Sequence, residues 1–466
     1  MTTSASSADP VADSPAADIR QISSRLADHG VSGVQIGWVD NNGIVRSRIV
    51  PTAEFDAASR RGVGVTAAFA VFDSQDGITF AYEGLSTPSG DVRLVPVISA
   101  AADVVQLAGQ PHLAWVNGRQ VSPDGNLWPY CQRAVLERQV ERAAALGLEM
   151  KAGYEIEMVL SREGEDYAPA HRGPAYGPNA LRDVDEFVAR LLRDLAANGI
   201  EIGQLHAEYG ESQVEIALAA MDPLTLADTQ VVARQTIHSA ARAEGLRASF
   251  APVTTVAGAG NGWHLHTSMS REGRNILPGP GPHGLSDDGR AYLGGLLREL
   301  PAIVAVTAPS TGSLLRRRPG YWAGAYGFWG VENREAALRL VPDSALLGPE
   351  RTNVELKASD ASANPYLALA MVLGAGLAGI ADTAELPEPV QEDVGTWDED
   401  ARSAAGIEPL ASTHEDQRAH LLQSPLAREV LGEQALGAFL ACRDADAAWA
   451  AERSVEEIVE AHRWLY

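Results

Sequence analysis

Two residue types are nearly missing from this sequence. Cysteine occurs twice, as Cys131 and Cys442, and only two of the 37 basic residues are lysines, Lys151 and Lys357. Two cysteines argue against a disulfide framework and favour a reducing compartment. The formal net charge of −24 disfavours nucleic acids and anionic membranes as partners, because both are negatively charged. We therefore expect a cytoplasmic protein that binds neither.

Segments that direct a chain to a membrane are also missing. The first 17 residues are small, polar and acidic, without the basic start and apolar core of a signal peptide, and we expect a disordered tail there. The longest apolar stretch, 366–380, is too short and too rich in alanine and glycine to span a bilayer, so it predicts a buried helix. With 466 residues, 45% of them hydrophobic, the chain is long enough for two or three domains.

The part that follows the tail favours a small β-rich domain. Asn41-Asn42-Gly43 is a strong hairpin signal between two alternating segments. The segments expected here are a helix over 19–29 and strands over 34–39, 44–50, 63–72, 92–96 and 113–116. Turns are predicted at Asn117-Gly118 and at 123–125, followed by an amphipathic helix over 134–146 that Gly147 closes. The chain thus divides into a tail (1–17), a first domain (18–117) and a larger domain (118–466).

In the larger domain, several predicted strands are polar on one face and apolar on the other, because alternate strand residues point to the same side. The residues that share a polar face are Glu155 with Glu157, Gln213 with Glu215, His264 with His266 and Ser268, and Glu355 with Lys357. Helices are expected over 184–198, 223–244, 288–307, 365–384 and 454–466. Asp183, Asn364 and Ser454 are placed to cap three of them. This pattern favours an α+β fold in which helices back a curved antiparallel sheet.

The polar faces and a cluster of arginines together indicate phosphoryl transfer. Carboxylates with one or two histidines form an oxygen-rich metal site, which selects Mg²⁺ or Mn²⁺ over zinc. Arg316, Arg317 and Arg318 precede a Pro-Gly turn, and Arg334 and Arg339 follow it. Guanidinium groups bind phosphate and carboxylate with two parallel hydrogen bonds and stabilise charge on a moving phosphoryl group. Each signal alone fits a solvated strand face or structural histidines, but the combination favours a nucleotide and metal site.

Six segments, in this order, carry a family resemblance: VDNNGIVRSRIVP, GYEIEMVL, HAEYGESQVEI, NGWHLHTSM, RRRPGYWAGAYGFWGVENREAALR and ELKASDASANPYLALA. The set resembles the type I glutamine synthetases and their relatives that make γ-glutamyl amides, over essentially the whole chain after the tail. The resemblance implies the glutamine synthetase fold, with an N-terminal β-grasp domain over 18–117 and a catalytic domain over 118–466. It also implies that ATP phosphorylates the γ-carboxylate of L-glutamate and that an amine then displaces the phosphate.

The resemblance also implies roles for individual residues. The expected metal ligands are Glu157, Glu208 and Glu215 for one ion, and Glu155, His264 and Glu355 for the other. The expected substrate-binding residues are Arg316 and Gly260 for glutamate, with Glu157, His264 and Lys357 beside them. The expected nucleotide side consists of His206, His266, Ser268 and Arg339, while Arg334 would stabilise the transferred phosphoryl group. The implied cofactors are ATP and two or three Mg²⁺ or Mn²⁺ ions per site, and the implied assembly is a homododecamer of two hexameric rings with sites between subunits.

Departures from the family pattern concern the amine. In the family, a flap residue after Pro-Gly-Tyr is a glutamate that closes over the ammonium site, but here Trp322 follows Tyr321. The Phe-Asp-Gly-Ser-Ser signature, whose aspartate helps to bind ammonium, is absent; residues 72–76 read Phe-Asp-Ser-Gln-Asp. Tryptophan offers an apolar wall or a cation–π surface to an alkylated ammonium. We therefore include Trp322 among the catalytic residues and expect an amine larger than ammonia. Lys357, where the family usually has arginine, is expected to reshape the γ-carboxyl or amine pocket.

Three functions stay open on the sequence alone. The favoured one is a γ-glutamyl-amine ligase for ethanolamine or a similar small monoamine. A polyamine is the alternative substrate, although a polyamine pocket usually needs acidic residues for the distal ammonium. The second function is a glutamine synthetase that uses ammonium through other residues. The third is a non-catalytic structural or regulatory family member, which the complete set of expected metal ligands disfavours.

Overall fold

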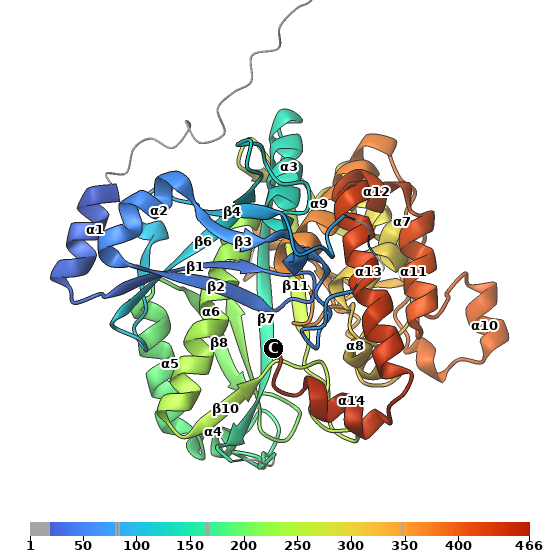
Figure 1. The fold of residues 1–466 in the computed structure, drawn as a ribbon. Helices are drawn as coiled ribbons and strands as arrows, with labels where there is room; N and C mark the ends of the chain where they lie inside the picture. The colour runs from blue at the N-terminus through green and yellow to red at the C-terminus, as the bar shows by residue number, and fades with distance from the viewer. Residues whose placement is uncertain (1–18, 80–81, 83, 165–166, 347) are drawn as a thin grey trace, which may run out of the picture.

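Two β-sheets and the helices around them make up the fold (Figure 1). The computed structural model describes residues 19–79, 82, 84–164, 167–346 and 348–466, so the predicted tail over 1–17 lies outside the described residues. The first sheet lies in the N-terminal part, drawn in blue, and the second, larger sheet lies beside it in the remainder of the chain. This arrangement is the α+β fold that the sequence predicted.

The first sheet begins with the predicted hairpin. Its strands are β1 (Gly33–Val39), β2 (Val45–Pro51), β3 (Val63–Thr66), β4 (Asp91–Pro96), β5 (Val105–Gln106) and β6 (Leu113–Val121). They lie in the order β2-β1-β6-β4-β3, with β5 paired to β6, and the helices α1 (Ile19–Asp28) and α2 (Phe55–Arg61) accompany them. Gly43, at the hairpin turn, has a φ of +72°, and a Cβ there would lie 2.5 Å from the carbonyl oxygen of Ser362. Glycine is therefore required where the hairpin turn packs against Ser362.

Two predictions for this part are wrong. The strand predicted over 63–72 ends at Thr66, because Ala67–Val71 turns into a 3₁₀ helix that the Thr66 hydroxyl caps. Asn117-Gly118 is not a turn but lies within β6, where Gly118 pairs with Pro96. A Cβ at Gly118 would lie 2.6 Å from the Leu94 side chain, so this glycine permits close packing inside a sheet. The boundary predicted at 117 falls inside a strand, and the division into two domains stays a proposal.

The second sheet carries the polar strand faces. Its strands are β7 (Glu149–Arg162), β8 (Ile202–Ala207), β9 (Gln213–Leu218), β10 (Leu246–Ser249), β11 (Trp263–Arg271), β12 (Arg274–Asn275), β13 (Trp329–Val331), β14 (Leu338–Val341) and β15 (Asn353–Leu356). Their order is β13-β14-β15-β11-β7-β9-β8, with β10 paired to β7 and β12 to β11. The predicted antiparallel pairing holds throughout the sheet except between β13 and β14, which run parallel.

Helices surround this sheet as predicted. They are α3 (Gln132–Ala145), α4 (Pro178–Arg182), α5 (Asp185–Ala197), α6 (Pro223–Ala243), α7 (Asp287–Thr307), α8 (Thr311–Arg316), α9 (Pro365–Asp382), α10 (Glu399–Ala404), α11 (His414–Gln423), α12 (Pro425–Leu431), α13 (Glu433–Ala450) and α14 (Val455–His462). The side chains of Asn364 and Ser454 cap α9 and α14, as expected. Asp183 does not cap α5, because the chain there is still helical at the end of α4, and Val184 takes the N-cap position.

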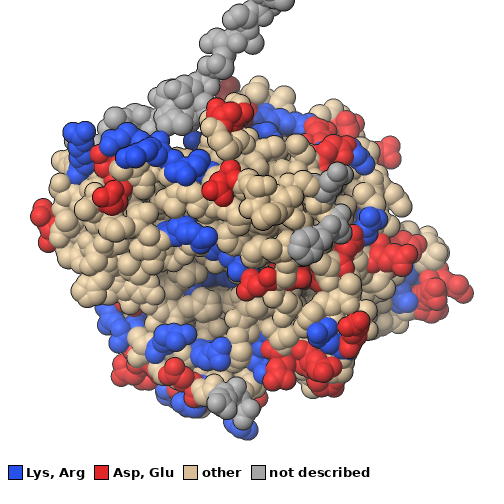
Figure 2. All heavy atoms as spheres, in the orientation of Figure 1, with Lys and Arg blue, Asp and Glu red and all other residues tan. Residues whose placement is uncertain are grey.

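The apolar face of the sheet forms one core with the helices behind it. Ile156, Met158 and Ile216 are fully buried in the same cluster as the apolar residues of α6, α7 and α9. Helix α9 is long and apolar enough to cross a membrane, but 78% of it is buried inside the protein, which confirms the predicted core helix. On the face drawn in Figure 2, many acidic side chains gather over the part that carries the C-terminal helices. The charged residues of the second sheet lie on its other face, opposite the apolar face that packs on the helices.

Candidate active site

Strand register places the predicted polar residues opposite one another. Across the β7–β9 pair Glu157 faces Glu215, and across the β8–β9 pair His206 faces the same Glu215. Across the β7–β11 pair His264 faces Glu155. Since alternate residues share a face, these side chains form one continuous row across the sheet.

The row continues to the far side of the sheet. His266 of β11 faces Glu355 of β15, and Glu355 in turn faces Arg339 of β14. Lys357 follows the end of β15 on the same face, with its Nζ 2.9 Å from Glu355 Oε1. Ser268, also predicted, is two residues beyond His266 on β11 and pairs with Lys151.

One end of the row holds a group of three potential ligands: His206, Glu208 and Glu215, whose ligand atoms lie within 4.8 Å of one another. The Nε2 of His206 is 3.5 Å from Glu208 Oε2 and 3.8 Å from Glu215 Oε1. Glu157, which the prediction placed with Glu208 and Glu215, accepts hydrogen bonds from Gln213 Nε2 and the Gly262 backbone N–H on its Oε2, both at 2.8 Å. The same Glu157 lies with its other oxygen 3.6 Å from His264 Nε2, so it joins the two ends of the row.

The other end centres on Glu155. His264 Nδ1 is 3.1 Å from Glu155 Oε2 and 3.5 Å from Glu355 Oε1, while His266 Nε2 is 3.3 Å from Glu155 Oε1. Two sets of three ligand atoms lie within 4.8 Å of one another here: Glu155 with His266 and Glu355, and Glu155 with Glu215 and His264. The structure therefore brings His266, which the resemblance assigned to the nucleotide side, into reach of any ion that Glu155 would bind.

The electrostatics of the row fit a divalent cation. Burial, followed by the charges of Glu155, Glu157 and Glu208, raises the pKa of Glu215 from its ordinary 4.5 to about 9. Burial alone would also raise the pKa of Glu155, but hydrogen bonds from His264 and His266 outweigh it and lower that pKa. The Oε2 of Glu208 is buried without a hydrogen-bond donor. Crowded carboxylates of this kind are stabilised by a bound cation, and their oxygen-rich set suits Mg²⁺ or Mn²⁺.

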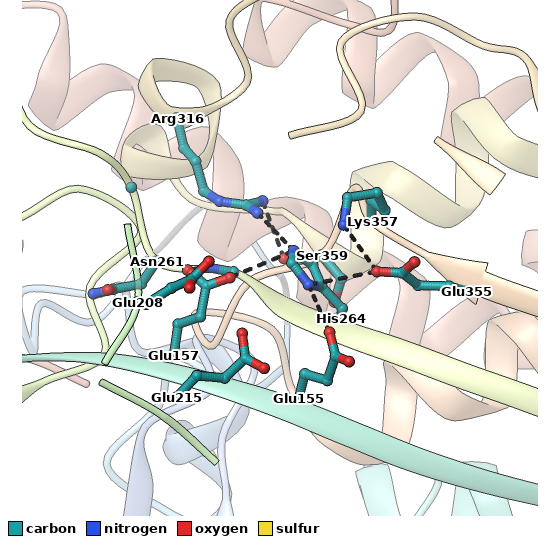
Figure 3. A network of polar contacts seen from close by, with 12 residues as sticks. Glu155, Glu157, Glu208, Glu215, Asn261, His264, Arg316, Glu355, Lys357 and Ser359 are labelled. Atoms are coloured by element: carbon teal, nitrogen blue, oxygen red, sulfur yellow. Dashed lines mark hydrogen bonds and ion pairs between the residues drawn. The ribbon is translucent and has the colours of Figure 1, made fainter. Parts of the chain in front are cut away.

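Arg316 enters the site from the end of α8 (Figure 3). It is buried, its Nη1 donates to the carbonyl oxygen of Ser359 at 3.1 Å, and its Nη2 lies 3.5 Å from His264 Nε2. Gly260 is the other residue predicted to bind the substrate glutamate, and it packs directly against Arg316. A Cβ at Gly260 would lie 2.7 Å from Arg316 Cγ. Glycine is thus needed for the loop over 251–261 to approach the arginine.

Gln213 connects the loop over 251–261 to the carboxylates of the sheet through hydrogen bonds. Its Nε2 lies 2.8 Å from Glu157 Oε2, 3.0 Å from the carbonyl oxygen of Gly260 and 3.0 Å from Asn261 Oδ1. Asn261 in turn donates to the carbonyl oxygens of Ser249 and Ala251. These hydrogen bonds fix the loop that carries Gly260 relative to the carboxylates.

The other cations of the arginine cluster have separate positions. Arg339 is buried, with its Nε 2.7 Å from Glu355 Oε2, whereas Arg334 is exposed. Arg317 is buried and donates to the carbonyl oxygen of Ala411. Arg318 donates to the Gly258 carbonyl oxygen and lies over the Tyr321 ring, 4.4 Å from its centroid. Next to it, Trp322 is 54% exposed on the turn after Pro319-Gly320.

Sequence reasoning missed several residues of this site. Gln213 lies on the strand face that the sequence predicted it to share with Glu215, but the sequence assigned it no role in the site. Tyr176 donates its hydroxyl to Glu208 Oε1 at 2.9 Å and stacks on His206, with ring centroids 6.0 Å apart. It comes from a loop and has a φ of +56°, and no sequence pattern signals that conformation. Asn261 and Glu335 are also loop residues.

Carboxylates, histidines and arginines on one face of a curved sheet are typical of enzymes that bind divalent cations and anionic substrates. A family model described as "Glutamine synthetase, catalytic domain" matches residues 129–461. The chain belongs to the glutamine synthetase family and is an ATP-dependent ligase of that family. A gamma-glutamylpolyamine synthetase, GlnA3, of Streptomyces coelicolor is 39% identical over 450 residues, which cover 96% of each chain. A glutamine synthetase of Methanosarcina mazei is 28% identical over 94% of this chain and 96% of its own.

Solved structures agree with this assignment. A crystal structure of a novel glutamine synthase homolog has a TM-score of 0.82 at 31% identity, covering 94% of this chain and 99% of that one. A complex of GmaS with ADP has a TM-score of 0.80 at 26% identity and covers 94% of this chain and 97% of that one. The fold extends over both sheets in each case.

Proposed function

We propose that this chain ligates the γ-carboxylate of L-glutamate to an alkylamine that carries a second amino group, through γ-glutamyl phosphate formed with ATP. The observation that carries the choice of an amine over ammonium is Trp322 at the flap position where ammonium-using relatives are expected to have a glutamate. The similarity to a gamma-glutamylpolyamine synthetase over 96% of both chains supports a di- or polyamine. The smaller monoamine that the sequence alone favoured is the alternative.

Glutamate is held at the buried side of the site. Arg316 binds its α-carboxylate, and the backbone at Gly260 approaches it. The burial of Arg316 removes water, which strengthens its interaction with a carboxylate. Glu157 and His264 lie within 3.6 Å of each other beside this position and bind the amino end of glutamate or a shared ion.

ATP binds along the row on the side of β11 and β14. Arg339 contacts its phosphates, Arg334 stabilises the transferred phosphoryl group, and His206, His266 and Ser268 line the nucleotide side. The residues that would hold Mg²⁺ or Mn²⁺ are Glu155, Glu157, Glu208, Glu215, His264 and Glu355, with His266 in reach. When bound, these ions supply the positive charge that lets a carboxylate approach a polyphosphate. Lys357 shapes the γ-carboxyl or amine pocket.

The proposal also includes the oligomeric state of the protein and its location in the cell. The double hexameric ring of the family, with sites between subunits, is retained here as the proposed oligomer. A cytoplasmic location is retained because Cys131 and Cys442 are both buried and unpaired, as in proteins of reducing compartments.

A panel of amines with glutamate and ATP fixed tests the proposal. The acceptors are 1,4-diaminobutane, spermidine, ethanolamine, methylamine and ammonium, and the readouts are phosphate release and the mass of the product. The highest kcat/KM for a di- or polyamine supports the proposal. Ammonium as the best acceptor would identify a glutamine synthetase, and ethanolamine as the best acceptor would identify the monoamine ligase. Absence of turnover with every amine, together with no binding of Mg²⁺ or Mn²⁺, would indicate a non-catalytic member.

A further inference from the structure

A buried carboxylate lies directly beneath the exposed turn that carries Trp322. Glu335 belongs to the loop between β13 and β14, directly after Arg334, and is only 4% exposed. The backbone N–H of Gly320 donates to its Oε1 and the N–H of Trp322 donates to its Oε2, each at 3.2 Å. The turn itself lies at the surface. Glu335 therefore faces the inner side of the flap that the family resemblance places over the amine.

Glu335 has no cationic partner of its own. Among the residues that the structure describes, no Lys, Arg or His nitrogen lies within 4.0 Å of its carboxylate. Burial raises the pKa of Glu335 and the nearby Asp393 adds to this, against the opposing effect of the two backbone N–H groups and of Lys357. A carboxylate accepts about four hydrogen bonds, and the turn donates two. An unpaired buried carboxylate is costly, so a cationic ligand at this position would stabilise it.

We propose that Glu335 is a specificity-determining residue that binds the second, non-reacting ammonium group of the amine substrate. This inference rests on the di- or polyamine acceptor proposed above. The reacting nitrogen must lose its proton before it attacks, whereas the second amino group of an alkyl diamine, like that of lysine, stays protonated at neutral pH. The indole of Trp322, attached to the same turn, offers an apolar and cation–π surface to the chain between the two nitrogens.

The position of Glu335 also gives a reason for the departure at Trp322. The glutamate expected at the flap is missing, and a carboxylate returns 13 residues later, hydrogen-bonded to that same residue. A negative charge is thus retained at the turn but at a more deeply buried place. Ammonium itself has no second charged group to pair with this carboxylate, whereas the non-reacting ammonium group of a diamine would pair with it.

Glu335→Gln tests the role, because it keeps the size of the side chain and one acceptor oxygen but removes the charge. We expect kcat/KM for 1,4-diaminobutane to fall about tenfold or more, while kcat/KM for ethanolamine and ammonium stays within about twofold. KM for glutamate and for ATP should not change. Glu335→Ser removes the charge with a smaller side chain and should give the same selective loss, so the test does not depend on one variant. Glu335→Asp keeps the charge and should retain part of the diamine preference.

Glu332→Gln is the matched control, since Glu332 lies in the same loop but is exposed. Its amine preference should equal that of the wild type. Equal losses for all amines in Glu335→Gln and Glu335→Ser, or raised KM values for glutamate and ATP, would show that Glu335 only holds the turn and would overturn the inference. The wild type tests the proposed function separately. Wild type that prefers ammonium or ethanolamine rejects that function, whereas a wild-type diamine preference that both variants keep rejects only the role of Glu335.

Discussion

The Nζ of Lys357 lies 2.9 Å from Oε1 of Glu355, and both side chains are almost fully buried. The second oxygen of Glu355 is paired with Arg339 Nε at 2.7 Å. Burial by itself would raise the pKa of Glu355, but Lys357, His266, His264 and Arg339 together outweigh it and lower the pKa to about 2. Glu355 is therefore ionised at neutral pH, ready to bind an ion, and two protein cations hold it in place.

Lys357 is the first residue whose replacement we expect to matter. Lys357→Arg introduces a longer, planar group into a space where the lysine is 4% exposed, so we expect altered turnover and amine preference. Lys357→Met leaves a buried carboxylate with one partner fewer and should lower the free energy of unfolding by about 3 kcal/mol. Steady-state kinetics and thermal unfolding measure the two effects. Lys151→Met is the control, because Lys151 is the only other lysine and is exposed. Unchanged amine preference and turnover in Lys357→Arg would refute its role in the pocket.

The strand faces of this site could be predicted from the sequence, but its contacts could not. A period of two places Glu155 and Glu157 on one face whatever their neighbours are. The pairing of His264 with Glu155 and of His266 with Glu355 depends on register between strands more than 80 residues apart, which no local pattern encodes. This is why the sequence could predict which residues lie on the polar face but not the distances between them.

The positions of loop residues could not be predicted from the sequence, because tertiary contacts set their conformations. Asn117-Gly118 has the composition of a turn, yet packing against Leu94 keeps it in a strand. Tyr176 and Trp322 both have positive φ values, which are unusual for aromatic residues and depend on the surrounding structure. Glu335 has no signal except its acidity in a segment rich in arginine. The fold and the departure at Trp322 could be predicted from the ordered motifs, whereas the position of Glu335 beneath Trp322 was found only in the structure.

Metal binding should depend on pH in a defined direction. In the metal-free protein the pKa of Glu215 is raised from 4.5 to about 9, so the folded state holds a proton there that the unfolded state releases. The stability that this protonation contributes is fully present below about pH 4.5 and is lost as pH rises through about 9. A divalent cation displaces the proton and removes this loss.

We therefore expect Mg²⁺ or Mn²⁺ to raise Tm more at about pH 8.5 than at about pH 6, relative to protein in EDTA. Saturation at about a hundredfold excess over Kd corresponds to about 3 kcal/mol of stabilisation. Glu215→Gln should remove most of the pH dependence. Glu211→Gln, an exposed acid just before β9, should keep it. A metal-induced shift in Tm that is the same at both pH values would contradict the assignment of Glu215.

Replacing Gln213 should raise the KM for glutamate more than the KM for ATP. Its amide nitrogen lies within 3.0 Å of oxygens of Glu157, Gly260 and Asn261, so Gln213→Ala releases the loop that approaches Arg316. Loss of one or two net hydrogen bonds, about 1.4 kcal/mol, corresponds to about a tenfold rise in KM for glutamate. KM for ATP should stay within about twofold. Gln204→Ala, at an exposed position of the neighbouring strand β8, serves as the control. Equal rises in both KM values would show a general disturbance of the site.

Asn364 should matter for stability well beyond its role as a helix cap. Its Oδ1 accepts from the backbone N–H groups of Tyr366 and Leu367, and its Nδ2 donates to the carbonyl oxygens of Val39 and Asp40 at 3.0 Å each. Asn364→Ala thus removes the cap of α9 and two bonds to the β1 end of the first sheet. We expect a loss of about 2–4 kcal/mol in unfolding free energy.

The exposed cap of α14 provides the comparison for Asn364. Ser454→Ala removes a cap alone and should cost about 1 kcal/mol. Denaturant unfolding of both variants measures the difference. If the two variants lose the same stability, the bonds between Asn364 and the first sheet contribute nothing.

Trp322→Glu restores at the flap the residue that ammonium-using relatives are expected to have. Trp322 is 54% exposed, so its replacement should leave Tm within about 1 °C of the wild type. We expect the ratio of kcat/KM for ammonium to that for 1,4-diaminobutane to rise about tenfold, because the new carboxylate attracts a small cation and the aromatic surface for the alkyl chain is lost. Trp322→Phe keeps an aromatic face and should retain the wild-type ratio. A ratio that Trp322→Glu leaves unchanged would mean that the turn over 319–322 does not contact the amine. In that case the choice of amine would have to come from residues deeper in the site.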